Sequence, residues 1–199
     1  PILSANTLYN GKTAFGDNKI FTAPDGTRIG VFGLETPETA TKAHPGKIKG
    51  VTFPAGQEMF KIAQNQVNAL KSQGCERIVC LGHLGIDSES AGNRSIDLLN
   101  AVKGIDIFID GHSHTVMAGE TVADAAGTPV LLTQTGSYFK NIGCMTINPE
   151  SAVGTITTTL ISTYEGADPV VDAIAKEWVA DVDDMLGEEI AVGDTKFYI

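Results

Sequence analysis

The spacing of apolar and polar positions along this chain predicts strands and helices in alternation. Apolar stretches rich in β-branched residues are typical of buried strands, and a 3.6-residue apolar repeat is typical of helices. The predicted strands are 77–81, 105–109 and 129–134. The predicted helices are 55–73, whose apolar stripe ends before Gly74, and 93–102, which ends before Gly104. A strand, helix, strand order with short connections favours a parallel βαβ unit and an α/β fold.

Turn residues divide the remaining sequence. Pro24-Asp25-Gly26 predicts a β-hairpin between 19–23 and 27–34, and Asn10-Gly11 predicts a turn after a short strand at 2–5. Residues 35–52 show no periodicity and are predicted to form a long loop. Residues 141–147 and 154–162 predict a final hairpin, and an amphipathic helix begins at Pro169 and ends at Gly187, before a last strand-like segment. We expect two parts, 1–164 and a linker helix region 165–199.

Composition excludes some classes of protein. The 199 residues are 42% hydrophobic and 19% charged, which is ordinary for a globular protein. A net charge of −10 without clustered Lys and Arg argues against binding a nucleic acid duplex. No apolar stretch reaches 18 residues, so no membrane span is predicted in this segment. The negative net charge still allows a small anionic substrate if a bound cation supplies positive charge at the site.

The cysteines and the chain ends give weaker information. Cys75, Cys80 and Cys144 are not spaced as a metal or redox motif, and packing is the expected role, with Cys80 and Cys144 in predicted buried strands. They do not settle the redox compartment. The chain starts at Pro1 and ends on an apolar stretch, so we expect a piece of a longer polypeptide.

Three of the four histidines follow predicted strands beside glycine. Gly111-His112-Ser113-His114 comes after the strand 105–109, and Gly82-His83 comes after 77–81. Open α/β folds place their chemistry at the carboxyl ends of strands. If the backbone stays extended, His112 and His114 point the same way and their imidazoles converge on one metal. The glycines would let the backbone approach a bound ion closely.

Other interpretations of these residues stay open. Taken alone, His83 could equally donate a hydrogen bond to a neighbouring carbonyl instead of binding a metal. His44 is expected to be a surface residue. Three histidines would suffice for a single zinc ion. Asp87, Asp106 and Asp110 are the candidate carboxylates, although Asp110 is better explained as turning or capping the chain. The residues in this sequence therefore supply only part of the ligands that a metal site with carboxylates needs.

Several nucleotide and hydrolase motifs are absent from the sequence. It contains no P-loop, no Gly-x-Gly-x-x-Gly and no Gly-x-Ser-x-Gly. Gly136-Ser137-Tyr138 is either a polar loop tip near the metal site or simply a turn after a strand.

The histidine motifs in their context resemble the 5′-nucleotidase branch of the calcineurin-like metallophosphoesterases. The resemblance includes Gly82-His83, 109–115 and 134–143, together with Leu3-Ser4-Ala5-Asn6 and 33–39. It implies part of a β-sandwich flanked by helices (αββα), with a C-terminal linker helix. It also implies two divalent metal ions (zinc, manganese or similar), His83 and His112 binding one and His114 the other.

The resemblance implies an activity as well. Family enzymes remove phosphate from nucleotides or other phosphate esters, as 5′-nucleotidases or 2′,3′-cyclic-nucleotide phosphodiesterases, by attack of a metal-activated hydroxide on phosphorus. The family's Asp-x-His, Gly-Asp and Gly-Asn-His motifs, which include the catalytic histidine, and its C-terminal nucleotide-binding domain are missing from this sequence. We therefore expect weak metal binding and little hydrolysis by this chain alone. The resemblance also implies an extracellular, cell-surface or periplasmic location.

Two other functions remain compatible with the sequence. One is a non-catalytic α/β module that binds a partner or a single structural metal. The other is a hydrolase of the same fold that acts on a sulfur ester. The sequence leaves open the nucleobase, the number of phosphates, the native metal and the oligomeric state.

Overall fold

The computed structural model describes residues 1–147 and 156–187. The chain divides into two units, Pro1–Ser162 and Thr163–Ile199. The first unit is built on a six-stranded sheet of order β3-β4-β6-β7-β9-β8. Its strands are β3 (Asn18–Thr22), β4 (Arg28–Glu35), β6 (Arg77–His83), β7 (Ile107–Asp110), β9 (Pro129–Thr135) and β8 (Val116–Ala123). The four central strands are parallel, and β3 and β8 run antiparallel at the edges.

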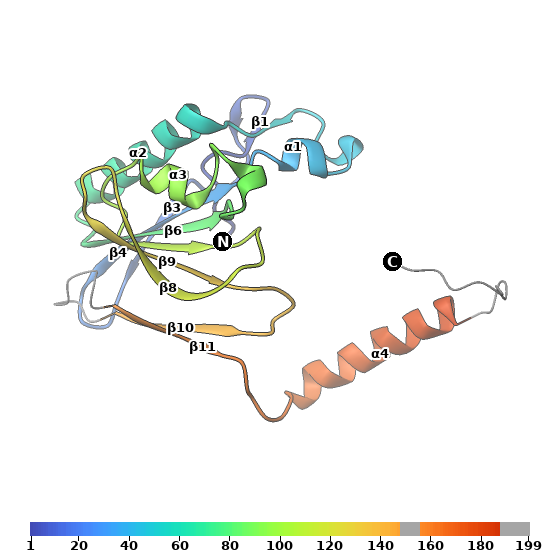
Figure 1. The fold of residues 1–199 in the computed structure, drawn as a ribbon. Helices are drawn as coiled ribbons and strands as arrows, with labels where there is room; N and C mark the ends of the chain where they lie inside the picture. Colours follow the sequence, from blue (N-terminus) through green and yellow to red (C-terminus); the bar gives the residue numbers. More distant parts are fainter. Residues whose placement is uncertain (148–155, 188–199) are drawn as a thin grey trace. The chain divides into compact units, whose positions relative to one another are not determined.

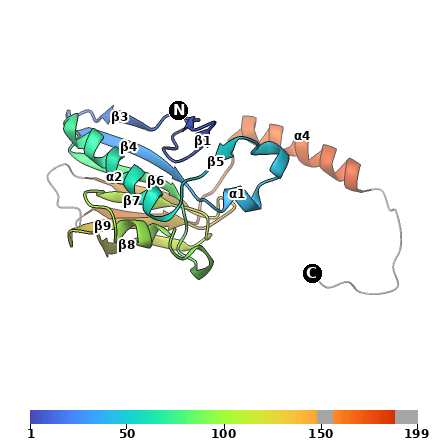
Figure 2. The ribbon, with the colours of Figure 1, turned by 90° about the horizontal axis from the view of Figure 1, so that it is seen from above.

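One face of the sheet is covered by helices. The predicted helix at 55–73 is confirmed as α2 (Gly56–Ser72), and Figure 2 shows it along β4 and β6. Its apolar stripe is buried against the sheet: Met59, Phe60, Ala63, Val67 and Leu70. The second helix, α3 (Ser95–Leu99), is shorter than the predicted 93–102, because Arg94 and Asp97 cap its start and the chain turns after Leu99.

The opposite face is partly covered by the predicted hairpin, β10 (Ile142–Thr146) and β11 (Thr157–Ile161) (Figure 1). Val79, Ile107 and Leu131 on the sheet form a second apolar cluster with Ile156, and Met145 packs against it. Cys144 on β10 is exposed, so the expectation of a buried Cys144 is wrong, whereas Cys75 and Cys80 are buried. Helices, a mixed sheet and a further β layer confirm the expected α/β architecture of a partial sandwich.

The predicted loop 35–52 contains three short elements, so that expectation is wrong in part. They are α1 (Thr39–Lys42), the 3-10 turn η1 (Pro45–Lys47) and β5 (Val51–Thr52), which pairs with β1 (Leu8–Tyr9). β1 also pairs with β2 (Lys12–Thr13) across the predicted turn at Asn10-Gly11. The predicted strand at 2–5 is only a single bridge from Leu3 to Gly16, because Ser4 and Ala5 bond to two different partners.

The second unit contains the predicted helix, α4 (Pro169–Leu186), which begins after Asp168 and ends before Gly187. The Asp168 carboxylate accepts hydrogen bonds from the N–H groups of Val170 and Val171 and so caps the helix. The strand-like segment expected after Gly187 lies outside the described residues. Within 1–147 and 156–187, no helix combines the length and apolarity that crossing a bilayer requires.

Candidate metal centre

The segment Gly111–His114 leaves β7 as a turn. His112 has φ 75° and His114 has φ 54°, both in the left-handed region that non-glycine residues rarely adopt. The expectation of an extended backbone is therefore wrong, and strand alternation does not align the two rings. Left-handed non-glycine residues cost about 1–3 kcal/mol each and cluster at functional sites.

His83 and His112 lie together at the carboxyl ends of adjacent parallel strands. His83 is the last residue of β6, and its ring centroid is 5.1 Å from that of His112, with an interplanar angle of 66°. A ring bound to zinc through one nitrogen has its centroid ~3.2 Å from the metal, so two rings at a tetrahedral angle stand ~5.2 Å apart. The separation in this chain therefore fits two imidazoles on one divalent cation.

His114 has a different neighbour. Its ring centroid is 6.3 Å from that of Tyr138, in the turn that follows β9. Tyr138 and Phe139 also have positive φ, 57° and 53°, and their side chains are exposed. The turn Gly136-Ser137-Tyr138 thus lies beside the histidine segment. This agrees with the interpretation of the turn as a loop tip near the site. Residues 1–147 and 156–187 contain no group of three or more His, Cys, Asp or Glu placed to hold one metal.

Asp110 connects the ends of β6 and β7. Its Oδ1 accepts hydrogen bonds from the N–H groups of Leu84, Gly85 and Gly111, at 2.9–3.2 Å. This agrees with the expectation that Asp110 caps the chain. Its Oδ2 is buried and has no hydrogen-bond partner. A carboxylate held in this way fixes the backbone from which His83 and His112 project.

The glycines beside the histidines make room for neighbouring side chains. The expectation that they also let the backbone approach a bound ion stays a prediction. A Cβ on Gly82 would lie 2.3 Å from the buried Phe108 ring, and one on Gly111 would lie 3.0 Å from Nδ1 of His83. Gly82 therefore admits the aromatic ring, and Gly111 admits the imidazole.

We expect Gly82→Ala to destabilise the fold by about 1–3 kcal/mol, because the added methyl overpacks a closed core around Phe108. Urea denaturation of the wild type and the variant measures the difference. Gly46→Ala is the control, since its Cβ would meet only the exposed His44 ring, at 3.2 Å. Equal losses in the two variants would contradict the packing explanation.

Glu38 joins the site from a distant segment and was not identified as a site residue from the sequence. Its Oε2 is 3.1 Å from Nε2 of His112 and 2.6 Å from Nζ of Lys42. The Ser90 hydroxyl donates to Oε1. The hydrogen bonds from Lys42 and Ser90, together with His112, lower the pKa of Glu38 to about 2. No local pattern indicates this contact, because 74 residues separate the two partners.

The other candidates have different contacts. His44 is exposed, as expected, and its Nδ1 accepts from the Gly46 N–H. Asp87 is exposed before the 3-10 turn η2 (Ser88–Ser90). Asp106 precedes β7, at the end of the sheet opposite to His112, and accepts from the Ile78 N–H at 2.7 Å. Burial raises the pKa of Asp106.

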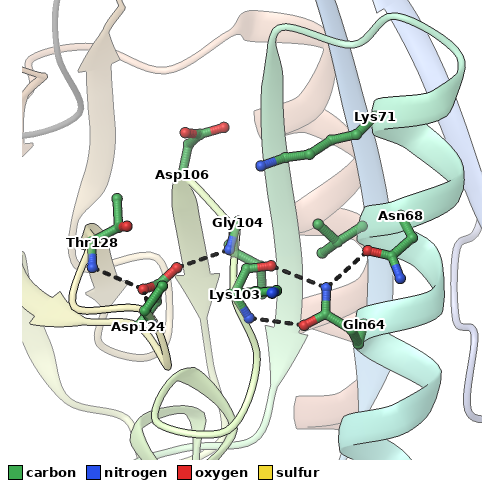
Figure 3. Close-up of a pocket in the computed structure, with 11 residues that line it drawn as sticks. Gln64, Asn68, Lys71, Lys103, Gly104, Asp106, Asp124 and Thr128 are labelled. Carbon is green, nitrogen blue, oxygen red and sulfur yellow. Dashed lines mark hydrogen bonds between the residues drawn. The ribbon is translucent and has the colours of Figure 1, made fainter.

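Asp106 lines a separate pocket of about 300 Å³ at that opposite end (Figure 3). Gln64 of α2 bonds to the backbone of Lys103 there, and Asp124 bonds to the N–H groups of Gly104 and Thr128. These side chains tie α2 and two loops together, and none of the three strand-end histidines lines this pocket.

Comparison with known proteins relates the chain to 5′-nucleotidases and calcineurin-like phosphoesterases. No family model matches. The trifunctional nucleotide phosphoesterase YfkN of Bacillus subtilis is 35% identical over 120 residues, 60% of this chain and 7% of that protein. The 5′-nucleotidase of Bos taurus is 25% identical over 223 residues, 100% of this chain and 36% of that protein. The resemblance found in the sequence is thereby confirmed.

A solved structure shows the same fold. The crystal structure of the calcineurin-like phosphoesterase YfkN from Bacillus subtilis superimposes with a TM-score of 0.72 at 18% identity, covering 94% of this chain and 64% of that one. The metallophosphoesterase-type fold is therefore confirmed. The chain spans only 7% and 36% of the length of the two curated relatives above.

Proposed function

We propose that this chain forms part of a metal-dependent phosphohydrolase that removes phosphate from nucleotides, of the 5′-nucleotidase or 2′,3′-cyclic-nucleotide phosphodiesterase type. The observation that supports it most strongly is the His83–His112 ring pair, 5.1 Å apart at the ends of adjacent parallel strands. The relationship to 5′-nucleotidases supplies the reaction class. The protein would work at the cell surface, outside the cell or in the periplasm.

His83 and His112 would hold one divalent cation, zinc or manganese, and His114 would contribute to a second. When bound, such ions supply the positive charge that neutralises phosphoryl oxygens and the acidity that activates water. A chain with a net charge of −10 needs such cations to attract a phosphate ester. The three histidines provide only part of a dinuclear ligand set. The chain by itself would therefore bind metal weakly and turn over little substrate.

The test is calorimetric titration of the chain with Zn²⁺ and Mn²⁺. His83 and His112 are the two proposed ligands of one cation, so we expect His83→Ala and His112→Ala each to weaken binding by about tenfold or more. His44→Ala is the matched control, since that histidine is exposed and distant in the sequence from both strand ends. Equal affinity in all three variants would contradict the site.

Hydrolysis of AMP and of an aryl phosphate, assayed with added Mn²⁺ or Zn²⁺, tests the activity. We expect little turnover from this chain. Robust turnover that a chelator abolishes would show that the ligand set is complete without further residues. Tight binding of one metal without any phosphatase activity, even when the missing motifs are supplied by a longer chain, would favour a non-catalytic module with a structural metal.

A further inference from the structure

Glu38 contacts the candidate ligand His112, whose ring nitrogen Nε2 faces the Glu38 carboxylate. Nε2 of His112 lies 3.1 Å from Oε2 of Glu38, and both side chains are mostly buried, at 17% and 19% exposure. An ionised carboxylate only accepts hydrogen bonds, so Nε2 is the nitrogen that carries the proton. Nδ1 of His112 is then left with a free lone pair.

Two residues besides His112 hold the Glu38 carboxylate in place. Lys42, one turn later in α1, lies 2.6 Å from Oε2, and Ser90 of η2 donates to Oε1. Ser90 is itself buried. Both oxygens of Glu38 thus have partners besides His112, which fixes the direction in which the carboxylate meets the ring.

We infer that Glu38 is a positioning residue that holds His112 in the Nε2–H tautomer and so presents Nδ1 to a divalent cation. The inference rests on the proposed function, in which His112 binds metal. Histidine ligands in proteins usually donate their second ring N–H to a carboxylate or carbonyl, which fixes the ring and raises its basicity. In this chain the segment after β4 supplies that carboxylate to a histidine after β7.

The first measurement is the tautomer of His112 by long-range proton–nitrogen NMR of the metal-free chain at a pH where the ring is neutral. We expect a protonated Nε2 in the wild type and a mixture of tautomers in Glu38→Ala. Glu38→Gln should keep the wild-type tautomer, because an amide oxygen still accepts from Nε2–H. An unchanged tautomer in Glu38→Ala would overturn the inference.

The second measurement is Zn²⁺ affinity of the same variants by calorimetry. Loss of such a carboxylate costs ~10–100-fold in metal affinity, and we expect Glu38→Ala to fall in this range. Glu89→Ala is the control, since it removes an exposed carboxylate from η2 that acts on Lys42 only through its charge. Unchanged affinity in Glu38→Ala would overturn the inference while leaving the proposed function intact. A wild type that binds no Zn²⁺ through His112 would instead refute the proposed function, and this inference with it.

Discussion

Asp110→Ala is expected to destabilise the first unit by about 3–5 kcal/mol, because it leaves buried backbone donors without an acceptor. Asp110 is only 8% exposed, and its carboxylate accepts hydrogen bonds from three N–H groups, those of Leu84, Gly85 and Gly111. Two of these donors follow His83 directly and the third precedes His112. The same substitution should therefore weaken metal binding, since it frees both histidine segments. Urea denaturation and Zn²⁺ titration measure the two effects.

Two further variants make this prediction specific. Asp110→Asn keeps one acceptor oxygen, so its loss of stability should be smaller than that of the alanine variant. Asp87→Ala removes an exposed carboxylate four residues after His83, and it should change stability by about 0.5 kcal/mol or less. If Asp87→Ala and Asp110→Ala unfold at the same urea concentration, Asp110 does not hold these strand ends.

Local patterns in the sequence predict the elements that pack through one regular face. The stripe from Met59 to Leu70 can be buried only by a helix, so α2 is predicted nearly to its ends. The parallel strands β6, β7 and β9 are predicted because each carries a short apolar stretch that a buried strand requires. The edge strand β8 (Val116–Ala123) is not, because most of its residues are exposed and no alternation marks it.

The candidate site is predictable in residue type but not in geometry. The Gly-His pairs at the end of β6 and directly after β7 identify His83 and His112, and the parallel pairing of these strands brings them together. The left-handed backbone at His112 and His114 depends on tertiary contacts, so the sequence suggested an extended segment instead. The Glu38–His112 contact joins loops that are 74 residues apart, so no short-range pattern in the sequence predicts it.

Asp124→Ala should cost about 2–4 kcal/mol at neutral pH, since this buried carboxylate also accepts hydrogen bonds from backbone donors. Its Oδ2 accepts from the Gly104 N–H, and its Oδ1 accepts from the N–H groups of Ala126 and Thr128, each at 2.8 Å. The side chain closes the β8–β9 turn and attaches it to the loop before β7 (Figure 3). Thermal or urea unfolding compares the variant with the wild type.

The effect should depend on pH in a defined direction. Burial by itself raises the pKa of Asp124, but the hydrogen bonds from Gly104, Thr128 and Ala126 together outweigh it and lower that pKa below its usual value. Because the pKa is lower in the folded chain, the stabilisation is fully present above the unfolded pKa of about 3.9 and is lost as pH falls through the folded pKa. The wild type should therefore lose on acidification the advantage that it has over Asp124→Ala, and the two unfolding free energies should converge.

Asp25→Asn provides the matched control for Asp124. Asp25 also occupies a hairpin turn and accepts from one backbone N–H, that of Thr27, at 2.9 Å, but it is exposed. Because Asp25 is exposed, water replaces that bond readily, so the variant should differ from the wild type much less than Asp124→Ala does at each pH. A gap between wild type and Asp124→Ala that stays constant down to pH 2 would show that the alanine variant suffers from lost packing and not from a lost ionised acceptor.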